Sequence, residues 1–480
     1  MDILDIKARD IREKIINREL TAGQVIEAYL NNIEEVEDEI NAFITIDKEG
    51  ARAQAQRIDE KLKNGEELGR LAGIPIGIKD NIMTKDMKTT CGSKMLNNFV
   101  SPYDATVIEI IKEEDGIIIG KMNMDEFAMG SSTEASYFGA TKNPLDKELV
   151  PGGSSGGSAA AIAAKLVAIA LGSDTGGSVN QPASFCGVVG IKPSYGRISR
   201  YGLVSLANTF DVIGILAKDT LDAAFLLSVL SGYDEKDPTT VTKNMPIDLK
   251  YKGYGENAFE NIKIGIPKEL FDVEIDDYVK ENFLKTIELI KENGGTVLEV
   301  SLPNLKYALE SYLLISNAEA SANLARFDGL RYGHRAKEYD TLDELFIKSR
   351  TEAFGEEVKR RIMLGTYILR KDHAEDYYMQ ALKVRTLIRE DFDRAFVDCD
   401  VLITPTSPIL PFKLGLKNKH PVDLYKADLF TVPVNLAGIC SMNVPIFNGQ
   451  DLPIGIQLIG NKFKEEDIIN LGFAIERMVK

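Results

Sequence analysis

Apolar residues recur with the period of a helix in several stretches of the chain. The first stretch follows Thr21-Ala22-Gly23-Gln24, a capping-box sequence, and carries apolar residues at every third or fourth position up to Ile33. The same period predicts further helices over Ala51 to Lys63, Ala105 to about Glu114, a segment that ends near Leu230, Asp276 to Asn293, and most of Leu305 to about Phe396.

Short apolar runs lie between these helical stretches and predict buried strands. They are found at Ala42 to Ile46, Gly73 to Lys79, Ile117 to Ile119, Leu166 to Leu171, Ile262 to Ile266, Thr296 to Val300, Val401 to Thr404 and Ile454 to Ile459. This β-α-β rhythm is typical of an α/β domain with a largely parallel sheet, to which both halves of the chain contribute. Residues 232–261 are polar and aperiodic, which predicts a long surface excursion.

Composition and charge narrow the class of protein. With 480 residues, 44% of them hydrophobic, the chain can bury a large core. The formal charge of −16 would repel a phosphate backbone, so any role with nucleic acid must come through a partner. The chain starts without the basic and apolar segments of a signal peptide, and its longest near-apolar run is too short to cross a bilayer. A soluble, cytoplasmic protein is expected.

Cysteine and histidine usage argues against metal and histidine chemistry. The four cysteines are scattered without a C-x-x-C pair, so neither a zinc knuckle nor a disulfide scaffold is expected. The only histidines are His334, His373 and His420, each in a polar neighbourhood that predicts a surface position. A Ser-His-Asp hydrolase and almost any zinc hydrolase need a histidine in the site.

Two glycine–serine loops, Gly152 to Ser158 and Gly176 to Ser178, enclose an alanine-rich segment and an apolar run. Glycines let a backbone turn tightly, and consecutive N–H groups can bind an anion or an oxyanion. Ser154 and Ser178 therefore lie where hydroxyl chemistry is possible. This composition is also typical of a flexible linker, but a linker is not followed at once by a helical segment and a buried strand.

With no credible histidine, a serine nucleophile needs a lysine or a carboxylate to take its proton. Lys79 ends an apolar run, where burial would lower its pKa toward neutrality. The alternative is a strand-end lysine whose ammonium group reaches out to water.

Two other glycine motifs could describe the first loop. The sequence Gly153-Ser154-Ser155-Gly156-Gly157 matches G-x-S-x-G, the nucleophile elbow of α/β-hydrolases, with Ser155 as the nucleophile. An elbow directly follows an apolar strand, whereas the polar stretch from Asn143 to Glu148 precedes this loop. No Lys-Ser or Lys-Thr closes either glycine run, which argues against a phosphate-binding P-loop.

These motifs together resemble those of the amidase signature family. The two loops match its signature, and Lys79-Asp80-Asn81 matches its lysine motif. The resemblance covers the whole chain and implies one α/β domain, residues 1–480, with a mixed, mostly parallel sheet of about eleven strands flanked by helices. Its expected parts are an N-terminal helical region (1–65), the signature core (66–231), the surface excursion (about 232–261) and a C-terminal half (262–480).

The same resemblance implies roles for individual residues. Ser178 would be the nucleophile, Ser154 a bridging serine in a cis peptide, and Lys79 the base. The N–H groups of Thr175, Gly176, Gly177 and Ser178 would form the oxyanion hole. Four positions depart from the family pattern, namely Asn180 in place of arginine, Val212 in place of glutamine, Ile215 in place of proline and Ala135 in place of asparagine.

Three further segments, Asn123 to Ser132, Glu357 to Tyr367 and Phe430 to Gly438, resemble the glutaminase subunits of tRNA-dependent amidotransferases. The resemblance implies a protein that releases ammonia from glutamine for the conversion of Glu-tRNA(Gln), with the conversion of Asp-tRNA(Asn) left open. Its partners would be the B and C subunits of a heterotrimer. ATP, Mg²⁺ and tRNA would be bound by the partner B subunit, with no metal or cofactor on this chain.

The subfamily resemblance also implies the groups that bind glutamine. Arg361 would take the α-carboxylate, Asp428 the α-ammonium group, and Tyr312 would add a hydroxyl contact. Two other functions stay open at this point. One is a stand-alone amidase that acts on a small amide, and the other is an inactive scaffold subunit, suggested by Asn180.

Overall fold

The computed structural model describes residues 2–242, 247, 259, 262–416, 423–447 and 452–479. Within them, one eleven-stranded sheet runs through the molecule in the order β1-β3-β2-β4-β6-β5-β10-β11-β9-β7-β8. The strands are β1 (Phe43–Ile46), β2 (Pro75–Lys79), β3 (Ile117–Met122), β4 (Ile169–Asp174), β5 (Val189–Lys192), β6 (Val212–Ala217), β7 (Lys263–Pro267), β8 (Thr296–Val300), β9 (Val401–Pro405), β10 (Cys440–Ile446) and β11 (Ile454–Gly460).

The sheet is mixed, and the expected α/β domain with eleven strands is confirmed. Parallel pairs form two groups, β3-β2-β4 and β9-β7-β8, on either side of an antiparallel centre. The share of parallel pairs is lower than the β-α-β rhythm predicts. The reason is that β5 with β6, and β10 with β11, are consecutive strands that pair directly in antiparallel fashion, without a crossover helix.

The predicted helices of the first half are present with slightly shifted ends. They are α2 (Ala22–Ile40), α3 (Lys48–Lys63), α4 (Thr106–Glu113), α5 (Gly156–Ala163), α7 (Thr220–Leu230) and, beyond the excursion, α8 (Asp277–Glu292). The capping box at the start of α2 is complete: Gln24 N donates to Thr21 Oγ1 at 3.0 Å, and Thr21 N donates to Gln24 Oε1 at 2.9 Å. This reciprocal pair satisfies two of the amides that a helix start leaves free.

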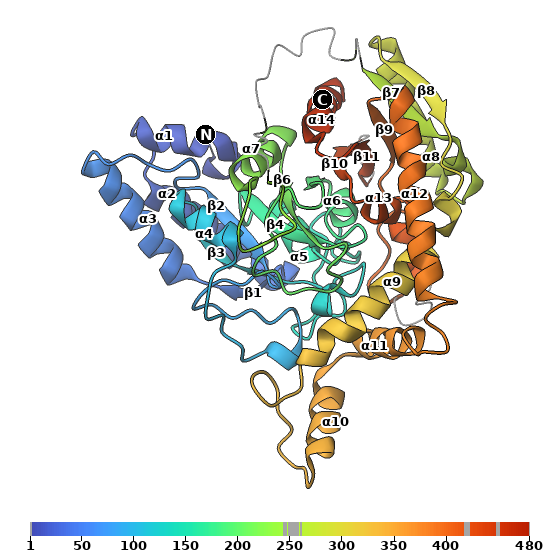
Figure 1. The fold of residues 1–480 in the computed structure, drawn as a ribbon. Helices are drawn as coiled ribbons and strands as arrows, with labels where there is room; N and C mark the ends of the chain where they lie inside the picture. The colour runs from blue at the N-terminus through green and yellow to red at the C-terminus, as the bar shows by residue number, and fades with distance from the viewer. Residues whose placement is uncertain are drawn as a thin grey trace.

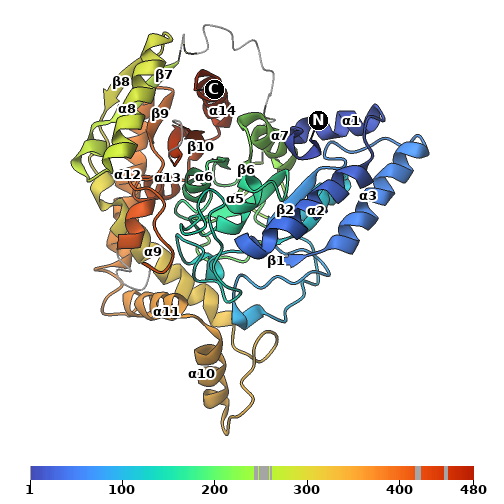
Figure 2. The same cartoon turned by 180° about the vertical axis from the view of Figure 1, so that it is seen from behind.

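The long helical stretch of the C-terminal half divides into four helices, α9 (Ala308–Asn323), α10 (Leu342–Ala353), α11 (Glu356–Ile368) and α12 (Tyr378–Asp398). Helix α9 packs against both α11 and α12. Helix α10 projects away from the body of the molecule, whereas α8 and α12 cover the side opposite to α2 and α3 (Figure 1, Figure 2). Both chain ends lie at the end of the molecule remote from α10 (Figure 1).

Several short elements have no clear signal in the sequence. They are α1 (Ala8–Ile16), α6 (Asn180–Cys186), α13 (Val432–Ala437), the strands β5, β6 and β10, and the longer C-terminal helix α14 (Glu465–Met478). Helices α6 and α13 have only seven and six residues, too few to show a helical period. Both of these short helices contribute to the candidate active site.

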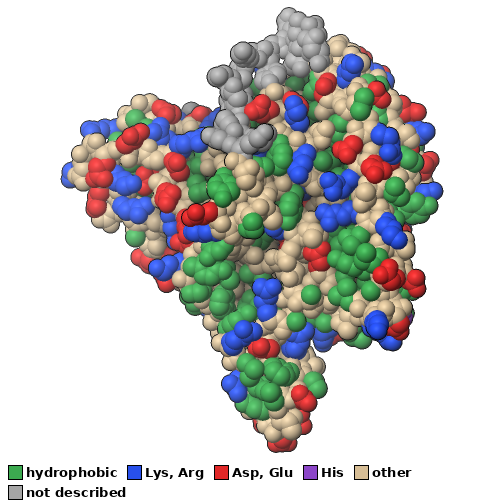
Figure 3. All heavy atoms as spheres, in the orientation of Figure 1, with side chains coloured by type: hydrophobic (Ala, Val, Ile, Leu, Met, Phe, Trp, Pro, Cys, Tyr) green, Lys and Arg blue, Asp and Glu red, His purple; other side chains and the backbone are tan. Residues whose placement is uncertain are grey.

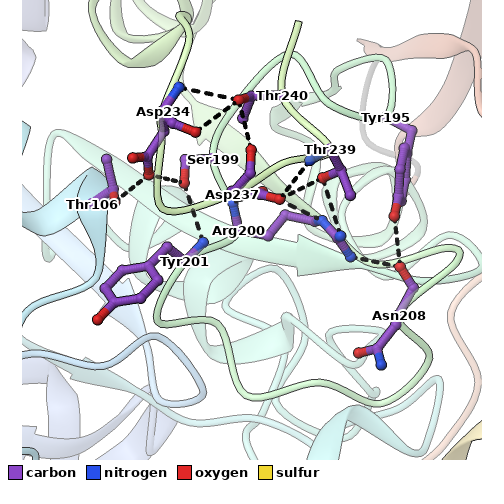
Figure 4. Close-up of polar contacts among 10 residues, drawn as sticks. All are labelled: Thr106, Tyr195, Ser199, Arg200, Tyr201, Asn208, Asp234, Asp237, Thr239 and Thr240. Atoms are coloured by element: carbon purple, nitrogen blue, oxygen red, sulfur yellow. Dashed lines mark hydrogen bonds and ion pairs between the residues drawn. The ribbon is translucent and has the colours of Figure 1, made fainter.

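The start of the expected surface excursion includes exposed residues such as Tyr233, Glu235 and Lys236, but two of its residues anchor it to the core. Asp237 and Thr240 are buried. Asp237 Oδ2 accepts the N–H of Arg200 at 2.8 Å, and the Arg200 guanidinium donates to Asn208 O at 2.6 Å and to Thr239 Oγ1 at 3.1 Å (Figure 4). Asp234 Oδ2 accepts from Thr106 Oγ1 at 2.6 Å. Side-chain hydrogen bonds therefore hold the start of this segment against the core, and most of the rest lies outside the described residues.

The surface seen in Figure 3 carries Lys and Arg side chains interspersed with Asp and Glu, without a large basic patch on that face. Of the histidines, His334 pairs with Glu352 and His373 packs against Tyr367, both partly exposed, whereas His420 lies outside the described residues. All four cysteines are buried and free. Among the residues that the structure describes, no helix is both long and apolar enough to cross a bilayer.

Candidate active site

Lys79 lies at the end of β2, and its side chain is completely buried. Its Nζ donates to Ser154 Oγ and Ser155 Oγ, both at 2.8 Å, and to Ser173 O at 3.1 Å. Burial lowers the pKa of Lys79 to about 7, and the nearby Asp174 carboxylate opposes this shift only in part. A lysine with this pKa is neutral in a large fraction of molecules near neutral pH, so it can accept a proton.

Ser154 follows a cis peptide bond between Gly153 and Ser154, as the family resemblance implied. The loop has no room for larger residues at its glycines: a Cβ built on Gly157 would lie 2.4 Å from Asn123 O, and one on Gly153 would lie 2.2 Å from Asp125 Oδ2. The glycines thus let the loop pass directly against the segment that follows β3.

Ser178 lies in the turn between β4 and α6, and it is 8% exposed. The carboxylate of Asp174 holds this turn from both sides, because it accepts the N–H of Gly177 at 2.8 Å and the N–H of Val179 at 2.7 Å. The backbone of Ser178 also meets the first loop, since its carbonyl accepts the N–H of Ser155 at 3.2 Å. The structure therefore brings the two glycine–serine loops and Lys79 into one site.

Helix α13 supports the same turn from the C-terminal half of the chain. Asn435 Nδ2 donates to Asp174 Oδ1 at 2.6 Å, and Thr431 Oγ1 donates to Gly176 O at 2.8 Å. These two contacts fix the side chain and the backbone that flank the candidate nucleophile.

The amides predicted for the oxyanion hole are not all available. The N–H of Gly177 already donates to Asp174. In the part of the chain that the structure describes, the N–H groups of Thr175, Gly176 and Ser178 donate to no protein group. Three of the four predicted donors are therefore free to bind a developing oxyanion.

Ser155, the nucleophile of the alternative elbow motif, is completely buried. Its Oγ accepts from Lys79 Nζ at 2.8 Å and donates to Ser173 O at 3.1 Å, and Ser173 N donates to it at 3.3 Å. A hydroxyl with all its bonding capacity used inside the protein is poorly placed to attack a substrate. This geometry favours Ser178 over Ser155.

Tyr312 and Asp428 lie directly beside the Ser178 turn. A Cβ built on Gly176 would lie 2.6 Å from Tyr312 Cζ, and one built on Gly177 would lie 3.3 Å from Asp428 Oδ1. Ser131 Oγ donates to Asp428 Oδ2, whereas the buried Asp428 Oδ1 has no hydrogen-bond partner among the described residues. Burial raises the pKa of Asp428 to about 8. An unpartnered buried carboxylate oxygen is a suitable acceptor for a ligand's ammonium group.

Arg361 lies on α11 and is 4% exposed, so it is not the surface charge that a helix of mixed polarity would suggest. Its Nε donates to Glu357 Oε1 at 2.9 Å, and Tyr425 OH donates to the same oxygen at 2.8 Å. Arg361 and Ser131 both line a cavity of about 590 Å³. The terminal nitrogens of the guanidinium have no hydrogen-bond partner within the described ranges and can grip a carboxylate.

Four residues with clear structural roles in the site were not predicted from the sequence: Asp125, Asp174, Gln181 and Asn435. Asp125 is buried and accepts the N–H groups of Thr133 at 2.9 Å and Ala135 at 3.2 Å. Asp125, Asp174 and Gln181 bind backbone groups of loops, and Asn435 binds the Asp174 carboxylate; spacing along the chain gives no signal for such contacts. Asp174 is the exception, because an acidic residue that directly ends a buried strand and starts a glycine turn is a recognisable position.

The four departures from the family pattern affect the site unequally. Val212 and Ile215 lie in β6, where Ile215 pairs with Leu171 on one side and Ile191 on the other. A proline in place of Ile215 would lack the N–H that a central strand uses, so these residues support the sheet. Ala135 contributes only its backbone N–H. Asn180 starts α6 and donates from Nδ2 to Ser441 Oγ at 2.8 Å.

No group of three or more His, Cys, Asp or Glu side chains suited to a metal ion occurs among the residues that the structure describes. The groups around Ser178 are hydroxyls, amides, one lysine and carboxylates. These groups suit acyl transfer through a serine.

Comparison with known proteins agrees with this geometry. A family model described as Amidase matches residues 24–469. The A subunit of glutamyl-tRNA(Gln) amidotransferase from Clostridium botulinum (strain Alaska E43) is 48% identical over 483 residues, covering 100% of this chain and 98% of the relative. The protein of the same name from Thermoanaerobacter pseudethanolicus is 49% identical over 480 residues, covering 100% and 98%.

Among solved structures, the crystal structure of the A subunit of glutamyl-tRNA(Gln) amidotransferase from Thermotoga maritima matches with a TM-score of 0.80 and 38% sequence identity. The match covers 99% of this chain and 95% of that chain. Sequence and fold are thus similar over the full length. The chain belongs to the amidase signature family, and it is similar throughout to the A subunits of glutamyl-tRNA(Gln) amidotransferases.

Proposed function

We propose that this chain is the glutaminase subunit of a tRNA-dependent amidotransferase, and that it hydrolyses glutamine through an acyl-enzyme on Ser178. The observation that carries the proposal is the buried Lys79, which donates to Ser154 Oγ at 2.8 Å beside the Ser178 turn and has a pKa near 7. Identity of 48% over the full length of a relative named as the A subunit of such an enzyme supports the choice of substrate.

In the proposed reaction, neutral Lys79 draws a proton through Ser154 from the Ser178 hydroxyl, and Ser178 Oγ attacks the amide carbon of glutamine. The C=O π pair moves onto oxygen, and the N–H groups of Thr175, Gly176 and Ser178 stabilise the oxyanion. One preorganised donor of this kind is worth about 3 to 4 kcal/mol in other acyl-transfer enzymes. The C–N bond then breaks, and the proton held by Lys79 returns through Ser154 to the departing ammonia.

The second half of the reaction repeats these steps with water. Water attacks the ester on Ser178, Lys79 again takes the proton through Ser154, and glutamate leaves as Ser178 Oγ recovers its proton. Lys79 therefore ends each half-reaction in its starting protonation state. Because the same group gives and takes the proton, a pKa near the working pH suits both steps.

Three residues would bind the groups that distinguish free glutamine from a simple amide. Arg361 would bind the α-carboxylate, Asp428 Oδ1 the α-ammonium group, and Tyr312 OH would add a hydrogen bond. Supporting observations are the unpartnered Asp428 Oδ1 and the uncommitted guanidinium nitrogens of the buried Arg361. Simple amides lack both charges, so these groups would select glutamine.

The proposal includes partners, since the relatives are named as one subunit of a larger enzyme. The chain would act in the cytoplasm with B and C subunits in a heterotrimer and deliver ammonia for Glu-tRNA(Gln). ATP, Mg²⁺ and tRNA would be bound by the partner B subunit. The formal charge of −16 supports this division, because a chain with that charge repels the phosphates of tRNA.

The test is a glutaminase assay of the purified full chain, alone and co-expressed with the B and C subunits from the same genome. We expect release of ammonia from glutamine, and glutamine-dependent amidation of Glu-tRNA(Gln) only in the three-subunit preparation. The Ser178→Ala variant of the complex should amidate with free ammonia but not with glutamine. Hydrolysis of small amides without activity on glutamine would instead identify a stand-alone amidase.

A further inference from the structure

Gln181 is a buried side chain that joins two loops of the site. It lies in the first turn of α6, three residues after Ser178, and is completely buried. Its Oε1 accepts the N–H of Gly153 at 2.9 Å, and its Nε2 donates to the carbonyl of Ser131 at 3.3 Å. One amide therefore holds the backbone next to Ser154 and the backbone of a residue that lines the cavity.

Ser131 is joined in turn to the proposed ammonium site. Its Oγ donates to Asp428 Oδ2, while Asp428 Oδ1 is the buried oxygen that faces the Ser178 turn. A continuous set of hydrogen bonds thus runs from Asp428 through Ser131 and Gln181 to Gly153. The next residue is Ser154, whose Oγ accepts from Lys79.

The segment around Ser131 and the loop around Ser154 are also held together by contacts that do not involve Gln181. Thr133 Oγ1 donates to Gly152 O at 2.8 Å, and Gly156 N donates to Thr133 Oγ1 at 3.1 Å. Asp125 N donates to Ser154 O at 3.3 Å. A substitution of Gln181 therefore leaves these two segments in contact. We expect it to change their exact position relative to each other and to leave the fold intact.

We propose that Gln181 is a positioning residue that couples ammonium binding at Asp428 to the position of Ser154, so that an amino-acid amide is cleaved faster than an amide lacking the ammonium group. The inference rests on the proposed function, because it takes Asp428 as the ammonium site. A bound ammonium group attracts the Asp428 carboxylate, Ser131 moves with it through its hydroxyl, and Gln181 passes the shift to Gly153.

A chain of hydrogen bonds demonstrates coupling only when a change at one end is measured at the other. The experiment therefore compares glutamine with 4-carbamoylbutanoate, which is glutamine without its α-ammonium group, using the full chain in its complex. In Gln181→Met we expect kcat for glutamine to fall about 10-fold and kcat for the probe to change less than about 3-fold. The ratio of the two kcat values should approach one.

Two further variants interrupt the hydrogen bonds between Asp428 and Gly153 at other points. Gln181→Glu keeps an acceptor for the Gly153 N–H but loses the donor to Ser131 O, and Ser131→Ala loses the hydroxyl that reaches Asp428. Both should lower the kcat ratio as Gln181→Met does. If one variant fails to fold, the others still decide the question. Gln457, a buried amide that donates to Thr404 Oγ1 and Phe430 O, provides the control Gln457→Met, which should leave the ratio unchanged.

Equal losses with glutamine and with the probe in Gln181→Met and Ser131→Ala would overturn the inference, because a merely structural role affects both amides alike. An unchanged ratio with unchanged rates would overturn it as well. Failure of the proposed function would look different: the wild-type complex would not hydrolyse glutamine at all.

Discussion

Lys79 Nζ lies 2.8 Å from Ser154 Oγ, and within the described ranges no carboxylate oxygen lies within ion-pair distance of this ammonium nitrogen. Its other contacts are Ser155 Oγ and the carbonyl of Ser173. Burial destabilises the charged form of a lysine that has no ion-pair partner, and the pKa of Lys79 therefore falls to about 7. The surroundings of Lys79 thus make it a base rather than a structural cation.

The pH dependence of glutamine hydrolysis should report on Lys79. The lysine accepts a proton only when neutral, so kcat at saturating glutamine is low below the Lys79 pKa of about 7 and rises to a plateau above it. The value of kcat is used because kcat/KM would also include the ionisation of Asp428 on binding, whose pKa is about 8. Initial rates between acidic and alkaline pH, in buffers of constant ionic strength, would measure this rise with pH. Lys79→Arg should be almost inactive at every pH, because guanidinium does not lose its proton. An active Lys79→Arg variant would place the base elsewhere.

Ser178→Ala and Ser155→Ala should differ in severity. Ser178→Ala removes the proposed nucleophile and should abolish hydrolysis. Ser155→Ala removes one hydrogen bond to Lys79 and two to the backbone of Ser173. Only the bond to Lys79 involves a reacting group, so a loss of about 10-fold is expected from that bond of about 1.5 kcal/mol. Mass spectrometry of an acyl-enzyme trapped at low temperature would locate the ester, and an ester on Ser155 would contradict the assignment.

Local patterns were sufficient to predict most long helices and strands. The capping box at Thr21 and the apolar run before Lys79 both depend on residues close in sequence, and both are found as expected. The proportion of parallel pairs was overestimated because the rhythm of helices and strands does not reveal which consecutive strands pair directly. The direction of β10 against β5, for example, depends on contacts between residues about 250 positions apart.

The candidate site was predictable to the extent that its residues belong to motifs. Lys79, Ser154 and Ser178 lie in short sequences with distinctive glycines, and the structure brings these sequences together. Asn435 and Gln181 were not predicted because each acts through side-chain hydrogen bonds to segments that are distant in sequence. The anchoring of the segment after residue 232 was missed for the same reason, since Asp237 is held by Arg200 of another loop.

The Arg361→Ala variant should lose most of the reaction driven by glutamine and keep the reaction driven by free ammonia. Removal of one partner of a desolvated charge pair costs about 2 to 5 kcal/mol, so kcat/KM for glutamine should fall about 30-fold or more. Amidation of Glu-tRNA(Gln) with free ammonia bypasses this pocket and should stay near normal. Both rates are measured on the same preparation of the complex.

A matched control for Arg361 lies on the same helix. Lys359 pairs with Glu356 and does not line the cavity, so Lys359→Ala should leave both rates within about 2-fold, as expected for a surface ion pair. Equal loss of the glutamine-driven and ammonia-driven rates in Arg361→Ala would show that Arg361 supports folding or assembly instead.

Glutamine binding should release a proton near neutral pH. The pKa of Asp428 is about 8 in the free protein, so this carboxyl group is mostly protonated at pH 7. A ligand ammonium beside Oδ1 favours the carboxylate and lowers the pKa, which expels close to one proton, about 0.9 at pH 7. Affinity should therefore rise with pH up to about 8 and level off above it.

Calorimetric titration of the Ser178→Ala variant with glutamine, in buffers of different ionisation enthalpy, would count the protons released without turnover. Asp428→Asn should bind about 10-fold more weakly or worse and release none. A titration that shows no proton release by the protein with Asp428 intact would mean that Asp428 is already ionised or does not meet the ammonium group.

Asn180 stands where the family resemblance predicts arginine, and its side chain hydrogen-bonds to β10 rather than to the turn that carries Ser178. Asn180 makes one hydrogen bond, to Ser441 Oγ, and its buried Oδ1 has no partner among the described residues. The carboxylate of Asp174 is instead held by the N–H groups of Gly177 and Val179 and by Nδ2 of Asn435. Among the residues that the structure describes, the donors that anchor the turn carrying Ser178 are thus uncharged.

Asn180→Ala should accordingly keep glutaminase activity within about 3-fold. One lost hydrogen bond costs about 1 kcal/mol, and loss of the unpartnered oxygen offsets part of it, so Tm should fall by no more than about 2 °C. Asn435→Ala removes a donor to Asp174 and should lower kcat about 10-fold with little change in KM, because the nucleophile turn is disturbed and the glutamine clamp is not. If Asn180→Ala were instead as impaired as Ser178→Ala, Asn180 would itself take part in the reaction, and the anchoring assigned to Asp174 and Asn435 would be insufficient.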